Sequence, residues 1–77
     1  MTDLGRLRWR CRRGMKELDV LLERWLERDA AVAKPEEIGC FEALLDLQDP
    51  QLARYLLAGD SHPDSDTAAL IERIRQP

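Results

Sequence analysis

The stretch Met15–Arg28, MKELDVLLERWLER, decides the fold class, because its apolar residues recur at the spacing of an α-helix. At about 100° per residue they form one stripe about 140° wide, as in a helix that covers a core on one side. The stripe consists of Met15, Leu18, Leu21, Leu22, Trp25 and Leu26. Val20 is the one apolar residue on the opposite, charged side. We therefore expect a helix over Met15–Arg28 that packs through this stripe.

A shorter helix is expected before this stretch. It covers Thr2–Arg12, and Leu4, Leu7 and Cys11 are spaced to share one face of it. Gly14 then interrupts the pattern, at the position expected for a left-handed C-terminal cap. The sequence thus predicts two helices joined by a tight connection.

Two more helices are expected in the middle of the chain. Pro35 suits the first turn of a third helix, and Asp49-Pro50 predicts an aspartate cap followed by a fourth helix over Pro50–Ala58 that ends at Gly59. The expected buried residues of the third helix are Ile38, Phe41, Leu44 and Leu45, with Leu47 as a further candidate. Those of the fourth are Leu52 and Leu56, with Tyr55 as a further candidate.

The last helix is expected over Asp66–Arg75, after a turn-rich loop, with Leu70, Ile71 and Ile74 facing the core. Five short helices with short connections predict an all-α fold, a small five-helix bundle. The length of 77 residues suits a single helical domain over residues 1–77.

Charge is distributed unevenly along the chain. Residues 1–28 carry eight basic and five acidic side chains, whereas residues 29–77 carry four basic and ten acidic ones. Between Arg6 and Lys16 there are six basic residues and no acidic one. A nucleic acid could bind there, with Trp9 stacking on a base, but one basic helix in a chain of pI about 5.1 is a weak footprint. We expect no nucleic-acid or membrane partner, and weak nucleic-acid binding through this helix stays as an alternative.

Residue types that serve catalysis and metal binding are scarce. Cys11, Cys40 and His62 cannot make an ordinary four-ligand metal site within one chain. His62 lies in a polar loop without an obvious partner, and the four glycines are scattered, so no phosphate-binding loop is expected. We expect no catalytic residue, no metal and no stably bound cofactor, with both cysteines as reduced thiols in the core.

A protein partner is the remaining possibility, and Trp9 points to one. Trp9 lies about 140° from Leu4 around the first helix, away from the stripe of Leu4, Leu7 and Cys11. A tryptophan beside arginines is typical of an interface anchor, although packing on a neighbouring helix would also explain it. Val20 suggests a second outward patch, but single exposed apolar residues are common.

Two segments resemble one known family. Leu7–Asp19, LRWRCRRGMKELD, is similar to the signature region of the SdhE family, the flavinators or FAD assembly factors of succinate dehydrogenase. The RGxxE core of that region falls at Arg13, Gly14 and Glu17. The later segment Phe41–Pro50, FEALLDLQDP, resembles the second block of the family, and the resemblance extends over about residues 4–59.

The resemblance implies a five-helix fold, in agreement with the periodicity, and a function as an assembly factor that is not an enzyme. Such a protein would bind the flavoprotein subunit of succinate dehydrogenase, and that of fumarate reductase, and promote attachment of FAD to a histidine of that subunit. An antitoxin-type binding role, described for some relatives, is the alternative within the family. We expect the free chain to be a cytoplasmic monomer.

The expected partner-binding residues centre on the same motif. They are Arg13, Gly14, Glu17, Met15, Trp9, Arg6, Arg12 and Asp19. As the resemblance implies, Gly14 would let backbones approach closely and Glu17 would accept charge-assisted hydrogen bonds, while the arginines orient the partner. From the residues alone, Gly14 could instead cap the first helix, and Arg13 and Glu17 could form an i, i+4 pair worth about 0.2–0.5 kcal/mol.

Overall fold

The structure is a computed structural model that describes residues 4–76, in which every regular element is a helix. The elements are α1 (Leu4–Arg10), α2 (Lys16–Asp29), the 3-10 helix η1 (Ala30–Val32), α3 (Pro35–Leu45), α4 (Asp49–Leu56) and α5 (Ser65–Arg75). The predicted all-α, five-helix fold is confirmed. The short 3-10 helix η1, which directly follows α2 in the chain, was not predicted.

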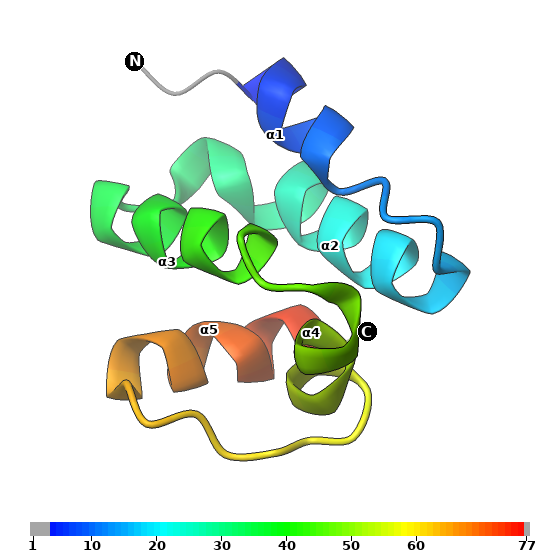
Figure 1. Cartoon of the computed structure of the whole chain (residues 1–77). Helices are drawn as coiled ribbons and strands as arrows, with labels where there is room; N and C mark the ends of the chain where they lie inside the picture. The colour runs from blue at the N-terminus through cyan, green and yellow to red at the C-terminus, as the bar shows by residue number, and fades with distance from the viewer. Residues whose placement is uncertain (1–3, 77) are drawn as a thin grey trace.

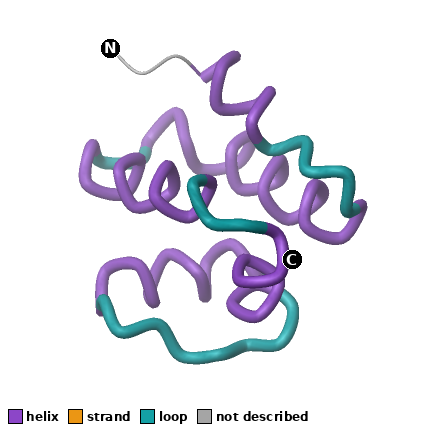
Figure 2. The backbone as a smooth tube through the Cα atoms, in the orientation of Figure 1, coloured by secondary structure: helices purple, strands orange, loops and turns teal. Residues whose placement is uncertain are grey.

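The helices are arranged around α5. In Figure 1, α1 lies at the top, α2 and α3 lie beneath it, and α4 and α5 form the lowest level. The helix α5 packs against α2, α3 and α4, whereas α1 packs on α2. The loops run along the outside, the longest of them between α4 and α5 (Figure 2). The C-terminal helix therefore closes the core, although most of the family resemblance lies before it.

The core is centred on two aromatic rings. Trp25 of α2 and Phe41 of α3 are fully buried and stacked, with ring centroids 4.5 Å apart. The expected inward residues of α3, α4 and α5 are buried, whereas the further candidates Leu47 and Tyr55 are half-buried and pack against the core. In the stripe of α2, four residues are buried, while Met15 and Leu21 at its edges are half-buried and pack against the core. The helical periodicity thus predicted the core correctly.

The first helix differs from its prediction. It ends at Arg10, so Gly14 does not cap it, although Gly14 does adopt the predicted left-handed backbone, with φ +87°. Leu7 and Cys11 are buried, but Leu4 is 37% exposed. The predicted start at Thr2 lies outside the described residues. Three residues after this helix end, Arg13 is held by the α3–α4 connection.

The starts of α4 and α5 show two different ways to begin a helix. Asp49 was expected to be the N-cap of the fourth helix, but the cap is Gln48, and Asp49 lies in the first turn with its carboxylate turned to Arg13. At α5 the cap is Asp64, whose carboxylate accepts hydrogen bonds from the backbone N–H and the hydroxyl of Thr67. These bonds hold the pKa of Asp64 below its ordinary value.

Candidate functional site

The predicted motif lies on the connection between α1 and α2 and on the first turn of α2. Gly14 is exposed on this connection, and its positive φ is a conformation that other residues adopt at a cost of about 1–2 kcal/mol. A Cβ atom built on Gly14 would meet nothing within 4 Å. The glycine is therefore required by its backbone conformation and not by internal crowding, and the space above it is open to a partner.

Arg13 holds this connection against the rest of the bundle. Its side chain is only 14% exposed, and its Nε donates to Asp49 Oδ1 at 2.7 Å. Its Nη1 donates to the carbonyl of Leu45 at 2.6 Å, and its Nη2 donates to the carbonyl of Leu47. One guanidinium thus joins the end of α3 to the start of α4, as its planar set of donors allows. The Arg13–Glu17 pair considered from the sequence is not formed.

Asp19 fixes the connection from its other side. Its Oδ1 accepts a hydrogen bond of 2.7 Å from the backbone N–H of Arg13, so the carboxylate on α2 spans the turn at Gly14. Between these two residues, Met15 is half-buried and packs against the core. The polar groups of Arg13 and Asp19 are therefore engaged within the chain, and they set the position of Gly14 between them.

Four arginines of the basic stretch pair with acidic residues from later parts of the chain. The ion pairs are Arg8–Glu27 at 3.0 Å, Arg12–Glu23 at 3.7 Å, Arg13–Asp49 at 2.7 Å and Arg10–Asp46. The pairs of Arg8, Arg10 and Arg12 are at least partly exposed and contribute little to stability, unlike that of the largely buried Arg13, but all four offset positive charge locally. This pairing weakens the argument for nucleic-acid binding, which rested on the run of basic residues along the sequence.

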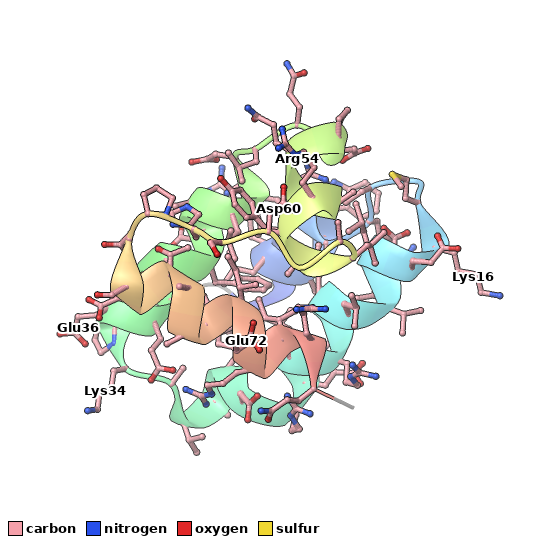
Figure 3. All side chains as sticks on the ribbon, turned by 90° about the horizontal axis from the view of Figure 1, so that it is seen from below. Lys16, Lys34, Glu36, Arg54, Asp60 and Glu72 are labelled. Carbon is pink, nitrogen blue, oxygen red and sulfur yellow. The ribbon has the colours of Figure 1, made fainter. Side chains whose placement is uncertain are left out.

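Glu17 behaves differently from the other acidic residues of α2. Within the described residues 4–76, Asp19, Glu23, Glu27 and Asp29 each contact a basic side chain or a backbone N–H, whereas the exposed Glu17 has no such partner. Its neighbour Lys16 is exposed as well and points outward from the start of α2 (Figure 3). An unpaired carboxylate beside an open glycine is suited to receive donors from another protein.

The remaining predicted site residues lie on α1 and the connection after it. Trp9 is 72% exposed, so the alternative that it packs on a neighbouring helix is wrong. Arg6 and Arg12 are exposed too. These side chains are accessible, as a partner-binding surface requires, and their role in binding stays a prediction. Asp49 is the residue that the sequence did not assign to the site, because its Asp-Pro context predicted a helix cap instead.

The two thiols have different environments. Cys11 is completely buried, and this burial raises its pKa to about 11, while Cys40 is half-buried. Both are free, and only Cys11 is the core thiol that the sequence predicted. Across residues 4–76, no group of three or more His, Cys, Asp or Glu side chains is placed to hold a metal ion. None of the described helices is long and apolar enough to cross a membrane.

The fold and this site define a small helical module whose polar residues hold one exposed turn in place. Among known proteins, the profile of the family described as "Flavinator of succinate dehydrogenase" matches residues 5–77, so the chain belongs to that family. This confirms the resemblance found in the sequence.

Individual relatives agree with the family assignment. The chain is 45% identical over 74 residues to the FAD assembly factor SdhE of Xylella fastidiosa, covering 96% of this chain and 76% of the relative. It is 41% identical to the protein of that name from Coxiella burnetii, covering 92% and 87%, and 32% identical to that from Shewanella oneidensis, covering 97% and 92%. No solved structure matches the chain.

Proposed function

We propose that this protein is an assembly factor that binds the flavoprotein subunit of succinate dehydrogenase and promotes the covalent attachment of FAD to it. The family membership and the names of the relatives support this function. The observation that carries it to particular residues is the turn at Gly14, held from within by Arg13 and Asp19, with the unpaired Glu17 beside it. The flavoprotein of fumarate reductase is a second partner of the same kind.

The proposed contribution of the chain is positioning. A histidine of the subunit reacts with its flavin only when the reacting atoms are held in a narrow geometry, and such restraint can lower a barrier by several kcal/mol. In this proposal the chain supplies no acid, base or nucleophile and binds no FAD by itself. It binds the subunit in an arrangement competent for attachment, and the reacting groups all belong to the partner.

The motif residues divide into two roles. Gly14 and Glu17 contact the subunit, together with Trp9, Arg6 and Arg12. Arg13, Asp19 and Met15 act mainly by holding the contact residues in place, since their side chains are engaged within the bundle. In this way an RGxxE motif combines one internal anchor with two external contacts.

The test is Glu17→Ala, with the flavoprotein subunit as the reaction partner. Because Glu17 is exposed and unpaired, its loss should change the free energy of unfolding by no more than about 0.5 kcal/mol. Covalent flavin fluorescence of the subunit should fall at least about tenfold, as expected when a charged hydrogen-bond acceptor is removed from an interface. A folded variant that supports attachment at the wild-type rate would refute the role of Glu17. A wild-type protein that fails to bind the subunit would refute the proposed function.

A further inference from the structure

A shallow apolar groove lies directly beside Glu17. It is lined by Lys16, Glu17, Val20, Leu21 and Leu57, and its volume is about 530 Å³, which is roomy enough for an aromatic side chain. Val20 is 49% exposed and Leu57 is 41% exposed, so two of the large apolar side chains that the bundle leaves open meet in one place. Singly exposed apolar residues are ordinary, but here they share one groove and so offer a continuous apolar surface to a partner.

The groove is formed by rigid parts of the fold. Val20 and Leu21 lie within α2, and Leu57 is the C-cap of α4, with its backbone N–H bonded to the carbonyl of Ala53 at 2.8 Å. The chain then turns at Gly59, which has a φ of +78°. Since α4 packs against α2, the two walls keep their separation, and a partner would bind a preformed surface without having to order a loop.

The rim of the groove carries two charged side chains that form no ion pair with the described part of the chain. Within residues 4–76, Glu17 is the carboxylate of α2 without an internal partner, and Lys16 beside it has no ion pair. One free charge of each sign makes the rim neutral overall. Polyanions such as nucleic acids and anionic lipid surfaces gain little from a neutral rim. A protein segment that carries an apolar side chain next to a basic one matches it, because the basic group can bind Glu17 while the apolar group is buried.

We propose that this groove binds an apolar side chain of the flavoprotein subunit, and that a basic residue next to that side chain pairs with Glu17. The inference rests on the proposed function and extends the interface from the RGxxE motif to Val20 and Leu57. In this arrangement Glu17 sets the register, and the apolar contact with Val20 and Leu57 supplies much of the affinity.

The experiment measures the Kd of the purified chain for the flavoprotein subunit with the variants Val20→Gln and Leu57→Gln. Each should weaken binding about fivefold and the double variant at least about twentyfold, as expected for losing partly buried aliphatic contacts. Val32→Gln is the matched control, because Val32 is 82% exposed and does not line the groove, and its Kd should stay within twofold of wild type. All variants should melt within about 3 °C of wild type, since they alter exposed positions.

The outcomes separate this inference from the function on which it rests. If Glu17→Ala weakens binding while Val20→Gln and Leu57→Gln bind like wild type, the function stands and the groove is not part of the interface. If the wild-type chain does not bind the subunit, both are overturned. If sedimentation shows a homodimer that Val20→Gln dissociates, the occupant is a second copy of the chain, and the proposed occupant is wrong.

A photo-crosslinking residue at position 20 identifies the occupant directly. We expect it to label a segment of the subunit that has a basic residue beside an apolar one. Exchanging that basic residue for glutamate should restore binding to Glu17→Lys at least tenfold relative to the unmatched pair, because the charges are again complementary. Labelling of an acidic segment, or no rescue by the exchange, would overturn the assigned pairing with Glu17.

Discussion

The two ends of α2 are built from similar residues but use them in opposite ways. At the N-terminal end, Lys16 and Glu17 have no ion pair within the described chain, and Val20 is half exposed. At the C-terminal end, Glu27 pairs with Arg8, and Arg28 contacts Asp29. The guanidinium groups of Arg24 and Arg28 also donate to the last carbonyls of α5, those of Gln76 and Arg73.

The difference places the unpaired charges of α2 at its N-terminal end, next to the motif. Arg24 and Arg28 donate to carbonyls at the C-terminal end of α5, which a helix leaves without partners. The C-terminal end of α2 is therefore fastened to α5. At the N-terminal end of α2, Asp19 binds the backbone of Arg13, and the side chain of Arg13 binds Asp49 of α4. These contacts do not involve Glu17. Lys16 and Glu17, which form no ion pair within the described chain, and the half-exposed Val20 thus lie next to the motif.

Charge reversal at the two ends should give the largest contrast. Glu17→Lys should weaken binding to the flavoprotein subunit at least about 100-fold, or about 2.7 kcal/mol, because it replaces an attraction with a repulsion. Glu27→Lys is the matched control on the same helix, and it should leave binding within about twofold. Loss of the exposed ion pair between Glu27 and Arg8 should lower the free energy of unfolding by at most about 1 kcal/mol. Titration calorimetry with the subunit measures both Kd values. Equal changes in Kd for the two variants would show that the two ends of α2 do not differ in binding.

Removing the anchor of the connection should have the next largest effect. Arg13→Met should lower the free energy of unfolding by about 2–3 kcal/mol, because three hydrogen bonds of a largely buried guanidinium are lost. Arg12→Met, which removes an exposed and longer pair with Glu23, should change stability by less than about 0.5 kcal/mol. Urea denaturation measures both. An Arg13→Met variant as stable as wild type would mean that Arg13 acts on the partner and not on the fold.

The smallest effect is expected from the thiol in the core near this connection. Because the pKa of Cys11 is raised from 9.0 to about 11, the folded chain keeps a proton that the unfolded chain releases near pH 9. Stability should therefore fall as the pH rises from about 9 to 11, by about 1 kcal/mol between pH 8.5 and 10. Cys11→Ala should reduce this slope in urea denaturation, and Cys40→Ala should retain it. An unchanged slope in Cys11→Ala would assign the pH dependence to other groups.

Helical periodicity is a local property, and it predicted most of the fold. The stripe over Met15–Arg28, the inward faces of the later helices and the left-handed Gly14 all follow from residue spacing and backbone sterics. Two positions were misjudged where a distant contact intervened. Asp49 does not cap the fourth helix, and its carboxylate is bound instead by Arg13, 36 positions away in the sequence. The first helix ends at Arg10, three residues before that contact.

The sequence by itself therefore determined the helices, their inward faces and the family motif, since each depends on residues a few positions apart. Only the tertiary structure decided which arginine meets which carboxylate, and that Leu57 lies beside Val20 and Glu17. Residues 1–28 alone contain eight basic side chains, and ten acidic ones follow in the rest of the chain, so spacing cannot select the pairs. Helix packing makes that selection: α1 on α2 brings Arg8 to Glu27 and the residue Arg12 after α1 to Glu23, whereas Arg13 reaches Asp49 at the start of α4. Glu17 has no such partner within the described residues 4–76, and it lies at the groove because α4 packs on α2 and brings Leu57 there.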